Sequence, residues 1–361
     1  SLRNGLPEET SVHWHGLPVA NPMDGVPNLT QEPVESGDSF EYRFRADPPG
    51  TYFYHSHAGL QLDRGLSGPL VVEEDDPHVD YDDEHVIVLD DYLADAPRSP
   101  SEGEQSSGDF GMGGGPMGGM MNEYRPPNAG MVMNGRGAGA PPTFEVSEGE
   151  RVRLRFVNAS SATMFRVRAG GHAFEVSHAD GRPVEPVSVD SFTFGPGERY
   201  DAIVTADNPG TWAIDAVPVR GSEPSARGVL RYAGRSDDQT PMTSGTDGRT
   251  LRYGDLRAVE SIDGLDGSPD RTFDLTLSPG GDGYSWAIDG QVFPDADPLD
   301  VREGEHVRIR MRNRSPFPHP MHLHGHFFRV GDAIKDTVVV PGRMGEATMD
   351  FRADNPGNWF F

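Results

Sequence analysis

Three pairs of histidines in this sequence have a spacing that suits metal binding. Each pair is written H-x-H, and on a β-strand residues two apart face the same side, about 6.6 Å from each other. Each pair therefore presents two imidazoles in one direction, which suits two neighbouring metal ions. The six histidines are His13, His15, His55, His57, His322 and His324.

The ligand types in these motifs favour a transition metal. Imidazoles without carboxylates in the same motifs favour copper, zinc, nickel or iron over calcium or magnesium, and zinc would be satisfied with fewer than six. His319 lies three positions before His322, across Pro320. In an extended chain it points away from the face of that pair, so we predict that it serves a different site. The alternative is a histidine in a turn.

The segments that must position these histidines repeat along the chain and have the pattern of β-strands. In each repeat a glycine precedes a stretch in which apolar and polar residues alternate, as in a strand of a β-sandwich. A Pro-Gly turn that enters an aromatic-rich strand forms a second repeat. The first repeat lies at 34–46, 146–160 and 301–315, and the second at 45–57, 205–216 and 352–361.

The repeats predict an all-β protein of three β-sandwich domains, at 1–76, 128–235 and 252–361. A chain of 361 residues is too long for one ordinary core. Residues 77–127 are expected to connect the first two domains. From about residue 95 this segment is rich in Gly, Ser, Pro and Met, which predicts a mobile linker or insertion.

The composition excludes several classes of function. The formal net charge is −26 and Lys335 is the only lysine, so nucleic acid is not expected as a partner. An acidic surface suits concentrated salt, because ions screen its self-repulsion; a GC-rich genome would explain arginine in place of lysine but not the excess of acids. No apolar run reaches the ~20 residues that span a bilayer. The sequence has no cysteine, so it offers no disulfide and no thiolate ligand.

The histidine motifs resemble those of a known family. HWHG, HSH and HPMHLHGH, in this order and at these distances, resemble three of the four copper signatures of three-domain multicopper oxidases, the laccases and copper-resistance oxidases. KDTVVVP at 335–341 and DNPGNWFF at the end are further matches, so that the resemblance covers nearly the whole chain. It implies three consecutive cupredoxin-like, plastocyanin-type Greek-key β-sandwich domains.

The resemblance also implies a copper assignment. His13 and His322 would bind the type 2 copper, and His319 the type 1 copper. The type 3 pair would be held by His15, His55, His57 and His324. A full-length member of the family would carry four coppers, take single electrons from a phenolic or aromatic reductant or from Cu(I), and reduce dioxygen to water. Such a protein would be secreted or attached to the cell surface.

The sequence departs from the family pattern at both ends. The family continues after NWFF into HCH, which carries the type 1 cysteine, whereas this sequence stops at Phe361 and starts at Ser1 without a methionine. We therefore expect a fragment with incomplete first and last domains, a lost signal peptide and, by itself, no blue copper site and no activity. The gene is expected to continue into the HCH motif if the oxidase is complete.

The sequence also suggests roles for residues outside the three histidine pairs. Asp24 matches the acidic residue that relays protons in related oxidases; a plain turn aspartate before Gly25 is the alternative. The methionines could offer thioethers to Cu(I), or they could be incidental to a flexible spacer; they are Met112, Met117, Met120, Met121, Met131 and Met133. Surface or strand-packing roles are expected for His78, His85, His172, His178, His306 and His326.

Two other functions compete with the oxidase. A non-enzymatic copper-sequestering protein would use the same histidines and the Met-rich stretch to buffer metal without turnover. A two-domain relative of nitrite reductase is disfavoured by the third repeat and by the lack of a cysteine in the first domain.

Overall fold

The computed structural model describes residues 1–93, 128–221, 224–235, 239–243, 248–280 and 285–361. Within these ranges the ordered elements are β-strands and short 3-10 helices, with no α-helix. The all-β class predicted from the alternating segments is therefore confirmed. No helix in the described ranges is long and apolar enough to cross a membrane.

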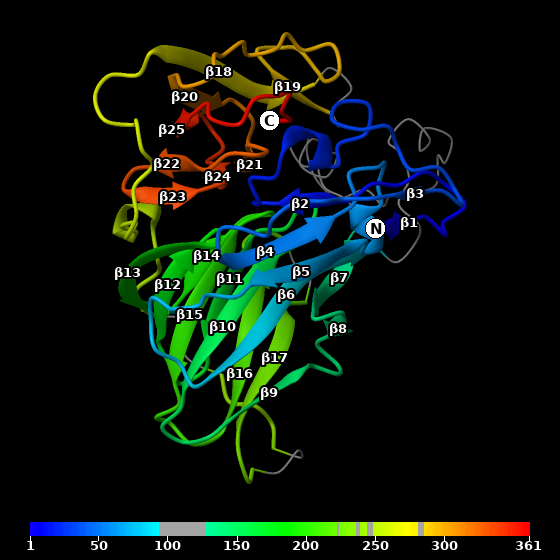
Figure 1. Ribbon diagram of the computed structural model, residues 1–361. Coiled ribbons are helices and arrows are strands. Elements are labelled where there is room, and N and C mark those ends of the chain that lie inside the picture. The colour runs from blue at the N-terminus through cyan, green and yellow to red at the C-terminus, as the bar shows by residue number, and fades with distance from the viewer. Residues whose placement is uncertain (94–127, 222–223, 236–238, 244–247, 281–284) are drawn as a thin grey trace, which may run out of the picture.

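The first unit, β1 to β5, consists of two small sheets (Figure 1, blue). One pairs β1 (Leu2–Arg3) with β3 (Ser39–Phe40), and the other has the order β2 (His13–His15), β4 (Gly50–His55), β5 (Ser67–Val72). The 3-10 helices η1 (Asn21–Met23) and η2 (Leu62–Arg64) lie in its loops. Its own apolar cluster is small and centres on Leu17, Val19 and Tyr52.

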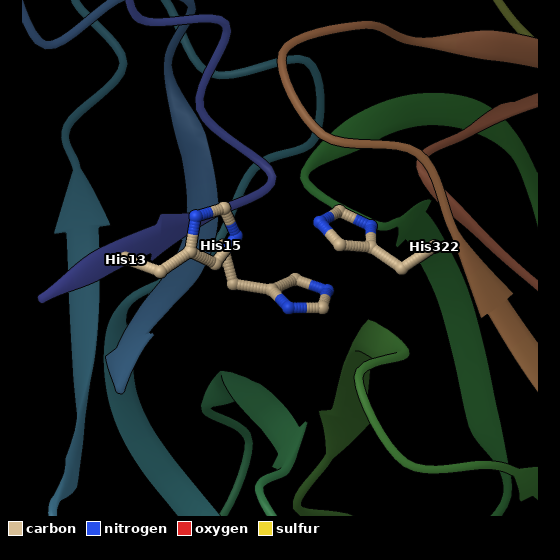
Figure 2. Close-up of side chains that lie close together, drawn as sticks. All are labelled: His13, His15 and His322. Atoms are coloured by element: carbon tan, nitrogen blue, oxygen red, sulfur yellow. The ribbon is translucent and has the colours of Figure 1, made fainter. Parts of the chain in front are cut away.

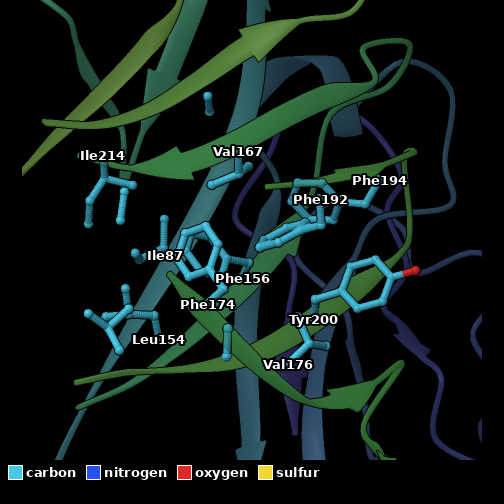
Figure 3. Close-up of a cluster of buried hydrophobic side chains, with 14 of the residues drawn as sticks. Ile87, Leu154, Phe156, Val167, Phe174, Val176, Phe192, Phe194, Tyr200 and Ile214 are labelled. Carbon is cyan, nitrogen blue, oxygen red and sulfur yellow. The ribbon is translucent and has the colours of Figure 1, made fainter. Parts of the chain in front are cut away.

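The middle unit, β6 to β17, is a sandwich of two sheets. The first sheet has the order β13 (Arg182–Val189), β12 (Phe174–Ala179), β15 (Arg199–Thr205), β10 (Arg151–Asn158), β6 (Asp83–Leu93), β7 (Asn128–Met133), β8 (Arg136–Gly137). The second has the order β14 (Phe192–Phe194), β11 (Phe165–Ala169), β16 (Thr211–Pro218), β17 (Ala226–Tyr232), β9 (Thr143–Val146). A continuous apolar core fills the space between them, with Phe156, Phe174 and Phe192 in mutual ring contact (Figure 3).

Strand β6 differs from the sequence-based expectation, which placed residues 77–127 in a connecting segment. In the structure β6 pairs in parallel with β10 and antiparallel with β7, in the interior of the seven-stranded sheet. The reason is burial, because Ile87 and Leu89 alternate along the strand and both point into the core at 0% exposure. The remainder of that segment, 94–127, lies outside the described residues, and the methionines Met112, Met117, Met120 and Met121 lie there with it.

The third unit, β18 to β25, has a six-stranded and a two-stranded sheet. The larger has the order β19 (Trp286–Ile288), β18 (Arg271–Pro279), β20 (His306–Asn313), β25 (Gly345–Arg352), β22 (Phe328–Val330), β23 (Ala333–Lys335). The smaller pairs β21 (His319–His322) with β24 (Thr337–Val340). A short 3-10 helix, η4 (Tyr253–Asp255), precedes the unit. Val307, Ile309 and Met349 belong to its apolar core.

The first and third units meet at one end of the middle sandwich. Figure 1 shows the blue strands β2 and β4 beside the orange strands β21 and β24, with the green sheets of the middle unit below both. The histidine motifs occupy β2, β4 and β21 and the turns that follow them. The fold therefore brings residues from opposite ends of the sequence to one junction.

Candidate metal centre

The six paired histidines form one cluster at this junction. The register of the sheet places His13 directly opposite His55, and both rings of β2 point inward while Trp14 occupies the other face. His322 and His324 reach the same place from the third unit. Figure 2 shows the rings of His13 and His15 on one side and that of His322 facing them on the other.

The rings contact one another across the two units. His13 stacks on His324 with ring centroids 3.8 Å apart, and His15 stacks on His322 at 3.7 Å. His55 lies 5.3 Å from His13 and 5.7 Å from His57 by the same measure. Each stacked pair therefore joins a ring of the first unit to a ring of the third.

The nitrogen atoms of these rings are arranged as metal ligands require. The Nδ1 atom of His13 is held by the carbonyl of Asp24 at 2.9 Å, and that of His322 by the carbonyl of Asp336 at 2.8 Å. The Nε2 atom of each ring is buried without a hydrogen-bond partner. Such an orphaned atom costs about 1–3 kcal/mol unless another ligand satisfies it. One ring nitrogen from each of His13, His15 and His322 lies within 4.8 Å of the other two.

The protonation state of the rings also suits a metal. Burial lowers the pKa of His15, His55 and His324 well below the ordinary value, and neighbouring histidines lower it further. Burial, followed by the charge of His13, lowers the pKa of His57 to about 3. These imidazoles are therefore neutral at physiological pH and keep a lone pair for coordination. The residues present fit a multinuclear transition-metal site.

Asp24 joins the cluster and is more than a turn residue. Its carboxylate is fully buried, with Oδ1 3.2 Å from His13 Nδ1 and Oδ2 3.0 Å from His324 Nδ1. Burial alone would raise the pKa of Asp24, but the two histidines reverse this and hold it below its usual range. The following Gly25 has φ +90°, and a Cβ there would lie 1.9 Å from the carbonyl oxygen of Val12. The tight turn thus brings Asp24 against both rings.

His319 lies outside the six-ring cluster. Its ring stacks on Trp286 of β19 with centroids 3.8 Å apart, and burial lowers its pKa to about 4. A blue copper site needs a thiolate, and this sequence contains no cysteine. The residues present therefore do not make a complete type 1 site.

The rings of the remaining histidines make no described contact with the six clustered rings, although His326 Nδ1 lies 3.1 Å from the backbone carbonyl of His324. His178 is buried between the first and middle units, where Nε2 lies 2.9 Å from Glu74. His306, in β20 of the third unit, has its Nε2 atom 3.2 Å from Asp350 Oδ1, and the Nε2 atom of His172 lies 2.7 Å from the hydroxyl of Tyr232. His85 lies near the carbonyl of Glu145, and His78 near that of Val184. His326 is buried beside the ring of Trp359.

Sequence reasoning missed two residues that contact the cluster and a third that holds one of them in place. Asp336 and Thr337 are in the KDTVVVP segment, and Arg199 comes from the middle unit. Thr337 Oγ1 lies 3.1 Å from His15 Nε2 and 3.2 Å from His322 Nδ1. The available signal was a charged and polar triplet immediately before a run of valines, because a buried strand seldom begins with two charges unless they are paired.

Comparison with known proteins identifies the family. Three family models, each described as multicopper oxidase, match residues 1–77, 83–235 and 267–361. Multicopper oxidase MmcO of Mycobacterium tuberculosis is 34% identical over 388 residues, which cover 99% of this chain and 74% of that protein. Copper resistance protein A of Escherichia coli is 34% identical, and the match covers 56% of this chain and 38% of that protein.

Solved structures give the same result for the fold. The multicopper oxidase Fet3p superposes with a TM-score of 0.82 at 22% identity, covering 99% of this chain and 78% of that one. Lac15 from a marine microbial metagenome superposes with a TM-score of 0.67 at 30% identity, covering 99% and 83%. The chain belongs to the multicopper oxidase family, and the predictions of cupredoxin-like fold, copper cofactor and oxidoreductase class are confirmed.

Proposed function

We propose that the protein is a laccase-like multicopper oxidase that reduces dioxygen to water at a trinuclear copper site built on the six-histidine cluster. The observation that carries this proposal is the convergence of ring nitrogens from the first and third units, two of which, Nε2 of His13 and of His322, are buried without a hydrogen-bond partner. When bound there, copper would supply one-electron redox chemistry and a site for dioxygen.

We assign His13 and His322 to the type 2 copper. The support is that each holds its Nδ1 on a backbone carbonyl and leaves Nε2 buried without a partner. The type 3 pair is assigned to His15, His55, His57 and His324. His15 Nδ1 and His55 Nε2 lie only 3.4 Å apart, which suits two nitrogens that share a small metal cluster. His319 is assigned to the type 1 copper.

Asp24 is proposed to orient the rings and to relay protons. Its lowered pKa keeps the carboxylate ionised at neutral pH, so it accepts hydrogen bonds from the Nδ1 atoms of His13 and His324. Reduction of dioxygen to water consumes four protons, so a group that can pass protons to the cluster is needed beside it. An ionised Asp24 would pass these protons on without storing one.

The electron donors proposed are phenols, aromatic amines or Cu(I). Relatives named Laccase-1 from Cryptococcus neoformans and Laccase-2 from Pleurotus ostreatus support the first two, and the copper resistance proteins support the last. We further propose a secreted or surface-attached protein, as its membership of the family suggests. The net charge of −26 and the single lysine support a salt-adapted organism.

The proposal is tested on protein expressed from the complete gene and loaded with copper. We expect four coppers per chain, a blue absorption band and oxygen consumption with a phenolic dye. His322→Ala should sharply reduce the rate of oxygen consumption. His85 is a half-buried histidine outside the cluster, so His85→Ala is the matched control and should leave turnover unchanged. Copper bound without oxygen consumption would instead support the non-enzymatic sequestering protein, and failure to bind copper would contradict both.

A further inference from the structure

The middle unit supplies no ring to the histidine cluster, yet its charged side chains reach the cluster's edge. Arg199, the first residue of β15, is fully buried and forms two parallel hydrogen bonds with Asp336 of the third unit. Nη1 lies 2.7 Å from Oδ1, and Nη2 lies 2.6 Å from Oδ2. A bidentate pair of this kind fixes the plane and the direction of the carboxylate.

That carboxylate lies at the edge of one of the stacked ring pairs. Asp336 Oδ1 is 3.6 Å from His15 Nε2 and 3.5 Å from His322 Nδ1. The hydroxyl of Thr337 donates to the same oxygen at 2.9 Å and lies 3.1 and 3.2 Å from the same two nitrogens. The carboxylate and the hydroxyl therefore contact one ring from the first unit and one from the third.

A second anchor holds the same segment from the middle unit. Asp180 Oδ2 accepts hydrogen bonds from the backbone amides of Asp336 and Thr337 at 3.3 and 3.2 Å. It also forms an ion pair with Lys335 at 2.9 Å, and Glu198 lies 3.0 Å from the same ammonium group. Three consecutive residues of the third unit, 335–337, are thus held by buried groups of the middle unit.

Two glycines beside the Arg199–Asp336 pair show how closely the three units approach one another there. Gly16, which follows His15 in HWHG, has φ +87°, and a Cβ there would lie 2.3 Å from Arg199 Nη2 and 2.5 Å from Asp336 Oδ2. Gly197 of the middle unit has φ +83°, and its Cβ would lie 2.9 Å from His15 Cε1. Both glycines leave room for the ion pair to reach the ring.

We infer that the Arg199–Asp336 pair, with Thr337, is a positioning element that sets the placement of His15 relative to His322. Through it the middle unit controls the geometry of a metal site to which none of its described residues contributes a histidine. Groups that orient metal-binding histidines in this way typically affect metal affinity or activity by about 10- to 100-fold. The inference rests on the proposed copper site.

Thr337→Val and Thr337→Ser form the central pair of variants, because valine has nearly the shape of threonine without its hydroxyl and serine keeps the hydroxyl. In copper-loaded protein from the complete gene, we expect Thr337→Val to release copper to a chelator about 10- to 100-fold faster and to change the type 2 electron paramagnetic resonance signal. Thr337→Ser should restore both. Asp336→Asn, which keeps the volume and loses the charge, should act in the same direction as Thr337→Val.

Arg153→Lys is the matched control. Arg153 is as fully buried as Arg199 in the same sheet, but its partners are Asp201, Glu74 and His178, none of which is in the cluster. It should leave the type 2 signal and copper release unchanged. A wild-type spectrum and release rate in both Thr337→Val and Asp336→Asn would overturn the inference. If the wild-type protein itself holds no copper, it is the proposed function that fails.

Discussion

The first and middle units are held together in different ways. The middle unit has a continuous apolar core drawn from both of its sheets, whereas the apolar cluster of the first unit centres on three buried residues. The first unit instead rests on the middle one through charged groups, since Arg153 pairs with Glu74, and Asp201 accepts a hydrogen bond from Thr51 at 2.9 Å. Four of the six clustered histidines therefore lie in the unit with the smaller core.

This difference suggests that apolar burial and buried ion pairs have separate roles in the molecule. Apolar burial gives stability without direction, whereas buried ion pairs add little net stability but fix one arrangement when every member is paired. The first unit must hold its histidine rings at fixed distances from those of the third unit, which requires contacts that fix orientation. The middle unit supplies a large apolar core, and through Arg199 and Asp180 it supplies the buried charges that hold residues 335–337 of the third unit beside the rings.

The largest expected effect is in the core of the middle unit. Phe156→Ala removes a fully buried ring that contacts Phe174 and Phe192, and we expect it to lower the free energy of unfolding by about 3–5 kcal/mol. Leu17→Ala in the first unit should cost about 2 kcal/mol, because its partly buried neighbours can relax. Urea unfolding measures both. An equal or larger cost for Leu17→Ala would contradict the comparison.

The next effect concerns the joint between the two units. Asp201→Asn removes the charge that pairs with Arg153 and Arg155 in the interior, at 2.6 and 3.2 Å. We expect a loss of about 3 kcal/mol, because two guanidinium groups lose a buried partner. Asp274→Asn, which breaks an exposed pair with Arg310, is the control and should cause no measurable change. Similar unfolding midpoints for the two variants would show that the joint does not depend on charge.

A smaller, pH-dependent effect is expected from Glu74 at the same joint. Burial alone would raise its pKa, but hydrogen bonds from His178 and Arg153 lower it from 4.5 to about 2. Its stabilising contribution is therefore complete above pH 4.5 and is lost as the pH falls toward 2. The stability difference between wild type and Glu74→Gln should shrink over this window. A difference that stays constant with pH would contradict the assignment.

The smallest effect is expected from methionine in the middle core. Met131 and Met133 are at 3% and 0% exposure and pack with the apolar core, so they are unsuited to capture Cu(I) from solution. Met133→Leu should cost less than about 1.5 kcal/mol and leave the copper content unchanged, as measured by unfolding and metal analysis. Loss of copper in this variant would reveal a ligand role for the thioether.

The sequence predicted the parts of the site that depend on local geometry. The H-x-H spacing drew attention to all six clustered histidines, although only His13 and His15 lie together in one strand, while His57 and His324 follow the ends of β4 and β21. Arg199 and Asp336 are 137 positions apart and have no such local pattern. Strand β6 was missed for a related reason, because it pairs in parallel with β10, more than sixty residues further along. The ligand assignments and the domain boundaries stay predictions.

Lys335 gives the molecule an unusual chemical property. It is the only lysine in the sequence, and its side chain is at 0% exposure between Asp180 and Glu198. Burial alone would lower its pKa, but the neighbouring acids raise it above the ordinary value. An acylating reagent can therefore reach this side-chain amine only when the joint between the middle and third units opens. The extent of acylation at this one position would therefore measure how readily these two units separate.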